Sequence, residues 1–150
     1  MINLLFTIEK IGPYHNARYN KISESKDFNL NVLETNTSSK RYPWRDPLNK
    51  NYNVFDLPQK KGIFSKFKNS NNVLKILKKT VPDIVYINGW HENISFYLIF
   101  ICQLKKIPVV IFSDSRFRDS KRIIFLELIK KLLLKGCSSA VVAGKESENY

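Results

Sequence analysis

Short apolar runs of strand length alternate with longer segments of helical character along the whole chain, and this alternation constrains the fold most strongly. The expected strands cover residues 2–7, 29–34, 53–57, 82–89, 107–112 and 139–143, and the expected helices cover residues 14–25, 73–79, 94–105 and 120–135. This order predicts an α/β fold, a three-layer sandwich in which helices cover both faces of a doubly wound, Rossmann-like parallel sheet of about six strands.

The length of 150 residues matches about one domain. The helical pattern that begins near Glu146 is cut at its first turn by the end of the sequence, so we expect residues 1–150 to be a fragment of a longer protein. No signal peptide is recognisable, and the longest apolar run, Ile94–Leu104, has about half the length of a membrane-spanning helix.

Cys102 and Cys137 lie in apolar surroundings far apart in the sequence, and neither belongs to a CxxC or Cys/His cluster. We therefore expect reduced core cysteines, as in a cytosolic protein, and no metal site of that type.

The net charge of +12, from 25 Lys and Arg against 13 Asp and Glu, favours an anionic partner. The lysines are dispersed, and no recognition helix or basic patch interleaved with aromatic residues is visible, so nucleic acid is not the expected partner. Glu127, Lys131 and Lys135 follow one another at i+4 steps, with Ile124 and Leu134 beside them. This stripe is either a solvated helix face or a surface that lies on anionic lipid.

Polar clusters follow three of the expected strands, where a doubly wound sheet binds its ligands. They are Gly12, His15 and Arg18 after the first strand, Asn88, Gly89, Trp90 and His91 after the fourth, and Ser113, Asp114, Ser115 and Arg116 after the fifth. Each cluster also has an ordinary structural interpretation, as a turn, an edge cover, a helix cap or a solvated face.

The expected strand order makes these clusters neighbours. Because the first strand adjoins the fourth and the fourth adjoins the fifth in such a sheet, we expect Gly12, His15, Asn88, His91 and Asp114 to converge on one cleft.

Several common nucleotide and hydrolase motifs are absent from the sequence. There is no GxGxxG after the first strand, no GxxxxGK[ST] and no GxSxG. Dinucleotide binding, P-loop nucleotide hydrolysis and α/β-hydrolase chemistry therefore have no support.

The same segments resemble retaining glycosyltransferases with the GT-B fold, close to glycosyltransferase family 4, over nearly the whole chain as the amino-terminal half of such an enzyme. The resemblance lies in "GPYHNAR", "PDIVYINGW", "IPVVIFSDSRFRD", "RIIFLELIKKLLLKGCSSAVVAG" and the final "ENY".

This resemblance implies two Rossmann-like domains that face a cleft, with the acceptor on the amino-terminal domain and the nucleotide-sugar donor mainly on the carboxyl-terminal domain. It implies no metal and no cofactor besides the nucleotide-sugar as co-substrate. The implied reaction transfers a hexose or related sugar, with retention, to a glycan or lipid-linked acceptor in cell-surface polysaccharide biosynthesis. The implied place is the cytoplasm, with peripheral contact at the inner face of the cell membrane, and the isolated chain should be inactive.

The resemblance also suggests roles for single residues. Gly12 matches the loop glycine that lets backbone approach the donor, and His15 and Arg18 lie where acceptor contacts are expected. Asp114 takes the position after the fifth strand where many members of the family carry a histidine, so Asp114 is the candidate catalytic residue. The other residues of the three clusters are candidate substrate contacts.

Two alternative functions stay open at this point. One is a non-enzymatic, basic, flavodoxin-like module that binds an anionic partner. The other is a sugar-nucleotide epimerase of the same GT-B architecture.

Overall fold

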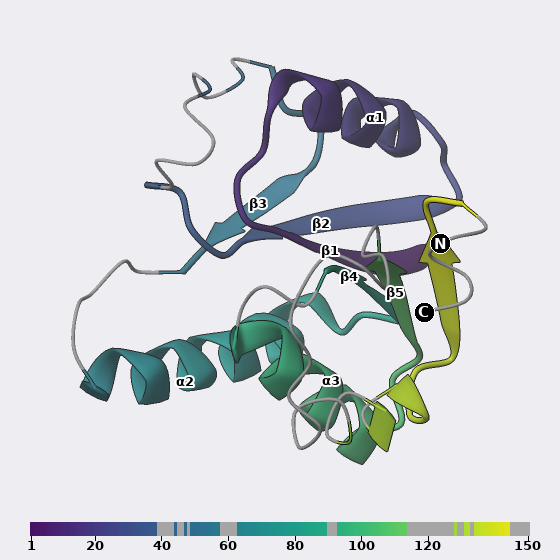
Figure 1. Ribbon diagram of the computed structural model, residues 1–150. Coiled ribbons are helices and arrows are strands. Elements are labelled where there is room, and N and C mark those ends of the chain that lie inside the picture. Colours follow the sequence, from purple (N-terminus) through teal and green to yellow (C-terminus); the bar gives the residue numbers. More distant parts are fainter. Residues whose placement is uncertain are drawn as a thin grey trace. The chain divides into compact units, whose positions relative to one another are not determined.

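The computed structural model describes residues 1–38, 44, 47, 49–57, 63–89, 93–113, 128, 131–132 and 134–144, with the backbone alone at 63–68 and 93. The strands are β1 (Ile2–Ile8), β2 (Phe28–Glu34), β3 (Asn53–Asp56), β4 (Ile84–Asn88), β5 (Val109–Ser113) and β6 (Ser139–Val142), and the helices are α1 (Pro13–Ser23), α2 (Ile63–Thr80) and α3 (Asn93–Leu104) (Figure 1).

The strands form a six-stranded sheet in the order β3-β2-β1-β4-β5-β6. The pairs β1–β2, β2–β3 and β5–β6 are parallel. The predicted α/β fold is therefore confirmed, including the neighbours expected for the first, fourth and fifth strands. The chain divides into two compact units, Met1–Val85 and Tyr86–Tyr150.

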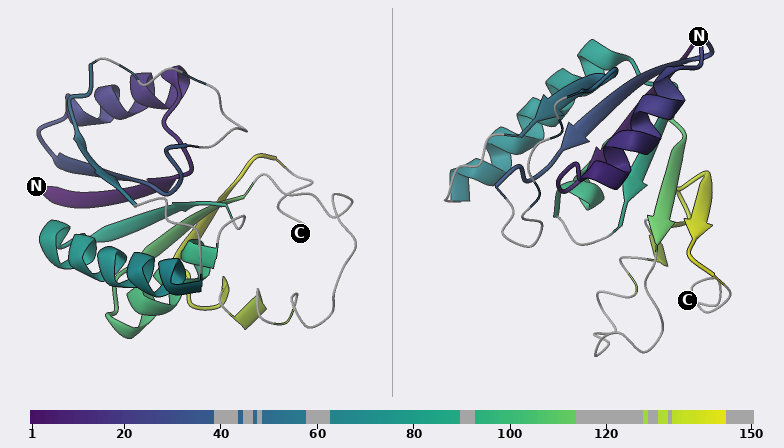
Figure 2. Two further views of the ribbon diagram at one scale, coloured as in Figure 1. Left: turned by 90° about the vertical axis from the view of Figure 1, so that its left-hand side faces the viewer. Right: turned by 90° about the horizontal axis from the view of Figure 1, so that it is seen from above.

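In the first unit, α1 and α2 lie on opposite faces of the strands (Figures 1 and 2). The core under α1 contains Ile8, Ile11, Tyr19, Leu30, Val32 and Tyr52. The ring of Tyr19 meets Phe6 and Tyr52 edge-on, with centroid distances of 5.7 and 5.4 Å. Side chains on alternate strand positions share a face, which explains why the even-numbered residues of β2 enter this core.

Asparagines occupy the opposite side-chain positions of these strands, and they bond to one another. Asn29 Nδ2 donates to Asn3 Oδ1 at 2.9 Å, and Asn53 Nδ2 donates to Asn31 Oδ1 at 3.1 Å. Asn31 is 3% exposed, so this pairing supplies the partners that a buried amide needs. It explains how a polar sequence such as "NLNVLE" forms an internal strand.

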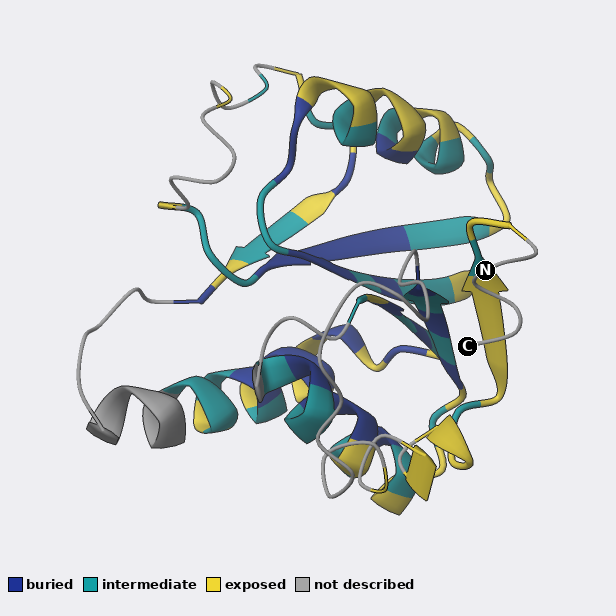
Figure 3. Cartoon of the chain, in the orientation of Figure 1, coloured by how far each residue is buried: buried dark blue, intermediate teal, exposed yellow. Residues whose placement is uncertain are grey.

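In the second unit, α3 contributes Leu98, Ile99 and Cys102 to a core shared with Val109 and Ile111 of β5. Burial raises the pKa of the Cys102 thiol to about 12 and also raises the pKa of Cys137. Cys102 and Cys137 are not joined by a disulfide. Strand β6 is largely exposed, in contrast to the buried β2 (Figure 3).

Three local features differ from the sequence-based expectations or go beyond them. Helix α2 begins at Ile63, well before the apolar repeat that starts at residue 73. The sequence did not predict this first part of the helix, because "IFSKFKNSNN" has few apolar positions. The expected helix over 120–135 lies mostly outside the described residues, and Leu132, one of its described positions, is 60% exposed. A Cβ at Gly136 would overlap the Gln103 side chain, so this flexible side chain would have to move to admit any other residue there.

Helices α2 and α3 both end in a left-handed residue that is not glycine. Val81 has φ 41° and its N–H donates to the Leu77 carbonyl at 3.0 Å, and Lys106 has φ 57° with its N–H on the Gln103 carbonyl at 3.1 Å. Both bonds are those of helix C-caps, where glycine is the preferred residue. A β-branched valine is the more strained of the two, since its Cβ crowds the backbone.

Val81→Gly should therefore raise the free energy of unfolding by about 1 kcal/mol. The matched control is Lys78→Gly, an exposed position within the last turn of α2, which should cost about 1 kcal/mol. Urea unfolding monitored by circular dichroism measures both. A loss of stability in Val81→Gly equal to that in Lys78→Gly would contradict the assignment of strain to Val81.

Candidate functional site

The junction between β1 and α1 is the best-defined candidate site, and it belongs to the first unit. Gly12 is the N-cap of α1, Pro13 follows it at the start of the helix, and the first turn contains no acidic residue. Proline suits this position because the first helical N–H groups have no partner within the helix. Gly12 makes no side-chain capping bond, so the first N–H groups of α1 have no such acceptor. The positive end of the helix dipole lies at the carboxyl edge of the sheet, where the parallel strands end.

Space rather than conformation favours glycine at position 12, because its φ of −96° is open to any residue. A Cβ on Gly12 would lie 3.0 Å from Nε1 of Trp44 and 3.1 Å from its Cε2. The indole therefore lies directly against the Gly12 backbone, while 40% of Trp44 stays exposed. An aromatic face in this position can stack on a planar or apolar part of a ligand.

His15 lies in the first turn of α1, half-buried between two tyrosines. Its ring centroid is 5.8 Å from that of Tyr14 and 6.3 Å from that of Tyr19. Among the described residues, the buried Nδ1 atom has no hydrogen-bond partner. Burial first, and the positive charge of Arg18 second, hold the pKa of His15 below 6.5. A neutral imidazole offers one donor and one acceptor, which suits the recognition of sugar hydroxyls.

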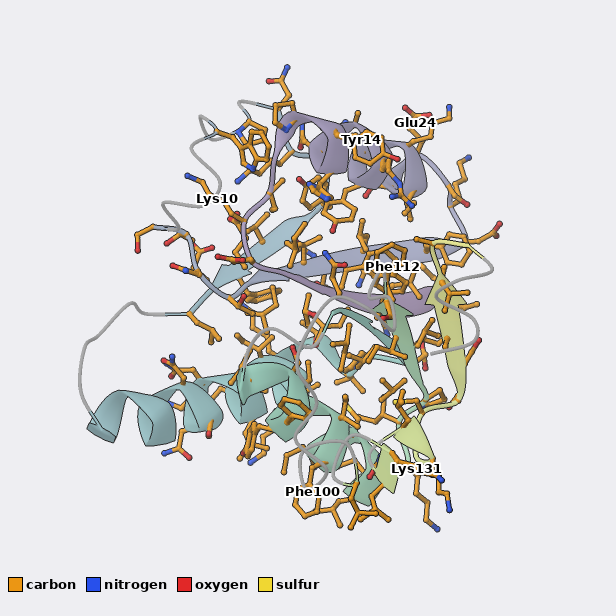
Figure 4. All side chains as sticks on the ribbon, in the orientation of Figure 1. Lys10, Tyr14, Glu24, Phe100, Phe112 and Lys131 are labelled. Carbon is orange, nitrogen blue, oxygen red and sulfur yellow. The ribbon has the colours of Figure 1, made fainter. Side chains whose placement is uncertain are left out.

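Arg18 lies one turn further along α1, with its guanidinium carbon 5.4 Å from the centre of the Tyr14 ring. This cation–π contact holds the exposed arginine near His15 (Figure 4 labels Tyr14). The structure therefore brings together the predicted residues Gly12, His15 and Arg18.

Helix α1 also binds the segment that precedes β3. The carbonyl of Asn49 accepts hydrogen bonds from the side chains of Asn16, at 3.1 Å, and Asn20, at 3.0 Å. The Asn51 N–H donates to Asn20 Oδ1 at 2.9 Å, and the Tyr52 hydroxyl donates to Asn16 Oδ1 at 2.8 Å. These bonds fix the orientation of the helix that carries His15.

The second unit holds the other described part of the predicted site, at the ends of β4 and β5. The Gly89 N–H donates to the Phe112 carbonyl at 3.0 Å, so Asn88 and Gly89 lie beside the end of β5 and Ser113. Gly89 has φ 81°, a backbone conformation that a side chain would oppose. Ser113 is 8% exposed and its carbonyl accepts the Ala143 N–H at 3.3 Å.

The remaining predicted site residues, Trp90, His91, Asp114, Ser115 and Arg116, lie outside the described residues. Gly12 and His15 belong to the first unit, whereas Asn88, Gly89 and Ser113 belong to the second. The convergence of these clusters on one cleft therefore stays a prediction.

Within the described ranges, no His, Cys, Asp and Glu side chains gather in a group that could hold a metal ion. Over the same residues, no helix combines the length and the apolar character needed to cross a bilayer.

The fold is similar to that of UDP-GlcNAc 2-epimerases. The enzyme from Methanocaldococcus jannaschii matches with a TM-score of 0.63 and 16% identity, over 97% of this chain and 41% of that chain. The enzyme from Neisseria meningitidis, solved bound to UDP-GlcNAc, matches with 0.62 and 14%, over 97% and 40%. The Rickettsia bellii enzyme matches with 0.62 and 15%, over 100% and 41%.

The chain thus spans about two fifths of the length of these structures. No family model matches the sequence, and no curated protein matches it. At these identities the likeness establishes the fold, which is the GT-B-like, Rossmann-type arrangement expected from the sequence.

Two residues of the site were not predicted from the sequence. Trp44 lies in a polar stretch of the sequence, where a single tryptophan indicates packing against another part of the protein or binding of a ligand. Glu34 is 4% exposed and lies on the same side of β2 as the buried Leu30 and Val32. An acidic residue at such an inward position was the feature of the sequence that could have identified it.

The lowered pKa of His15 predicts a pH dependence of stability. Above pH 6.5 the imidazole is neutral in the folded and unfolded states alike. As the pH falls below 6.5, the unfolded chain binds a proton before the folded protein does, so the free energy of unfolding declines until the pH passes the lowered pKa. His15→Gln should flatten this decline, because the substitution removes the titrating imidazole. Urea unfolding between pH 5 and 8 measures the free energy of unfolding of both proteins.

An NMR titration of the histidine C2 protons provides the direct check, with His15→Gln assigning the resonance. A His15 pKa at or above 6.5 would contradict the burial described for this side chain.

Proposed function

We propose that the protein is the acceptor-side, amino-terminal half of a retaining glycosyltransferase with the GT-B fold. The enzyme transfers a hexose or related sugar from a nucleotide-sugar to a glycan or lipid-linked acceptor. A carboxyl-terminal donor-binding domain completes it, and the sugar transfer takes place in the cleft between the two domains.

The observation that supports this proposal best is the β1–α1 junction. A helix start without a side-chain cap offers N–H groups and a positive dipole to an anion such as a diphosphate. Beside it lie a half-buried neutral imidazole and an indole packed against the Gly12 backbone. Hydrogen-bonding groups next to an aromatic face are the features that a sugar attached to a phosphate requires.

The residues after β4 and β5 complete the proposed site. Asn88, Gly89 and Ser113 would contact the sugar or the acceptor, as would Trp90, His91, Ser115 and Arg116. Asp114 would orient the reacting sugar or acceptor hydroxyl in the position that a histidine takes in many related enzymes.

The second candidate is a sugar-nucleotide epimerase of the same architecture. The observation that favours it is the similarity of the fold to UDP-GlcNAc 2-epimerases, one of them bound to UDP-GlcNAc. Both candidates bind a nucleotide-sugar, and they differ in the need for an acceptor.

Product analysis of the full gene product with a panel of nucleotide-sugars separates the candidates. A glycosyltransferase releases the nucleotide only when an acceptor is present, and the new linkage keeps the anomeric configuration of the donor. An epimerase converts UDP-GlcNAc to its C2 epimer with no acceptor. Unchanged nucleotide-sugars under both conditions would contradict the proposal and its alternative.

His15→Ala in the same protein should lower kcat/KM for the acceptor roughly tenfold, as expected for the loss of about one hydrogen bond. The matched control is Lys21→Ala, an exposed position in the last turn of α1, which should leave acceptor kinetics unchanged. Equal kinetics in both variants would remove His15 from the acceptor site.

We further propose that the second unit contacts an anionic membrane surface through a basic–apolar surface. The residues of this surface are Phe100, Leu104, Lys105, Lys106, Leu128, Lys131, Leu132, Leu134 and Lys135, all exposed. The contact between Gln103 and Gly136 shows that the end of α3 adjoins the segment that carries Lys131 and Lys135. Figure 4 labels Phe100 and Lys131. Leucine and phenylalanine side chains framed by lysines match the chemistry of an anionic lipid headgroup region.

Sedimentation with vesicles that contain phosphatidylglycerol tests this surface. Leu104→Ser should weaken binding, and added salt should weaken it further, because lysines attract the headgroups electrostatically. Val81→Ser is the control, since Val81 is 66% exposed, as Leu104 is, but lies in the first unit. Equal binding by the two variants would contradict the assignment.

A further inference from the structure

A buried carboxylate lies at the carboxyl end of β2, next to the candidate site. Glu34 is 4% exposed, and its Oε1 accepts a hydrogen bond from the Ile11 N–H at 2.6 Å. Ile11 is itself fully buried, so its N–H depends on a partner within the protein. A short bond to a carboxylate is among the stronger hydrogen bonds that a backbone amide makes.

The backbone on both sides of this bond is already paired. Thr35 N–H donates to the Ile8 carbonyl and Asn36 N–H donates to the Glu9 carbonyl, each at 2.9 Å. These bonds extend the β1–β2 pairing past the end of β1, where Ile8 and Glu34 are partners in register. The Glu34 side chain then reaches beyond them to Ile11, the last residue before the N-cap of α1.

Ile11 is directly connected to the groups of the candidate site. The next residue, Gly12, supports the Trp44 indole on its backbone, and its carbonyl accepts the Asn16 N–H at 2.9 Å in the first turn of α1. A displacement of Ile11 would therefore move Trp44 and the turn that carries His15.

We propose that Glu34 is a positioning residue, which holds the loop between β1 and α1 so that Gly12, Trp44 and His15 take the geometry that binds substrate. The substrate part of this inference rests on the proposed function. An apolar residue at position 34 would fill the space but would leave the buried Ile11 N–H without its acceptor. A buried carboxylate costs free energy unless hydrogen bonds compensate for its lost hydration, so its presence here indicates that the bond to Ile11 matters. The charge also reaches Tyr52, whose pKa is raised to about 12 by burial first and by Glu34 second.

Trp44 reports the position of the loop through its fluorescence. The chain has two tryptophans, so Trp90→Phe leaves Trp44 as the single tryptophan, which can be excited selectively over the tyrosines. In that background Glu34→Ala should shift the emission to longer wavelength and increase quenching by acrylamide. Glu34→Gln should restore the emission, because its amide oxygen still accepts from the Ile11 N–H.

The control is Asp56→Ala, since Asp56 is the partner of Glu34 in the β2–β3 register and carries an exposed carboxylate at the same edge. This variant should leave Trp44 unchanged. Unchanged emission in Glu34→Ala, or an equal shift in Asp56→Ala, would overturn the inference.

The full gene product supplies the functional measurement. Glu34→Ala should lower kcat/KM by up to about 100-fold, the effect of misplacing a binding group by about 1 Å, while Glu34→Gln recovers most of it and Asp56→Ala loses none. If no substrate is turned over at all, the proposed function fails while the fluorescence still decides the role of Glu34.

The Ile11 amide provides a measurement that does not depend on the alanine variant folding. In a ¹H–¹⁵N spectrum, the Ile11 amide proton of the unmodified protein should resonate far downfield, and Glu34→Gln should move it upfield as the charge is removed. An Ile11 resonance that is the same in both proteins would overturn the inference.

Discussion

Parallel strands that are covered by helices on both faces must supply a partner for every polar side chain they carry. In the first unit, this requirement explains the bonds made by the asparagines of these strands and by Glu34. The asparagines pair across neighbouring strands, Asn29 with Asn3 and Asn53 with Asn31. Glu34, on the other face, has no asparagine opposite it and instead accepts a hydrogen bond from the loop that leads into α1. Burial thus fixes both the sheet and the loop that borders the candidate site.

The sequence was sufficient to predict what depends on local patterns. The strands and the parallel order follow from the apolar runs and their alternation with helical segments, and the structure agrees with them. It was insufficient where tertiary contacts decide. The extension of α2 to Ile63 has a weak apolar repeat, and the contact between Gly12 and Trp44 joins residues that α1 and β2 separate in the sequence. The inward direction of Glu34 was visible in the alternation, but its partner at Ile11 required the coordinates.

The fold is compatible with more than one reaction, because the same architecture serves enzymes with different chemistry. The neighbours of known structure are UDP-GlcNAc 2-epimerases, whereas the sequence motifs resemble family 4 glycosyltransferases. Under the proposed function, either enzyme would use the helix start at Gly12 and the imidazole of His15, and the residues after β4 and β5 would decide the reaction.

The turn at Gly89 has a consequence for the chemical durability of the protein. Asparagine followed by glycine is the dipeptide most prone to deamidation, which begins when the glycine nitrogen attacks the asparagine side chain and closes a five-membered imide. Here the Gly89 nitrogen donates its proton to the Phe112 carbonyl, and the backbone is held at φ 81° between β4 and β5. The hydrogen bond to β5 therefore engages the nitrogen that would attack, and it should slow the conversion of Asn88 to aspartate.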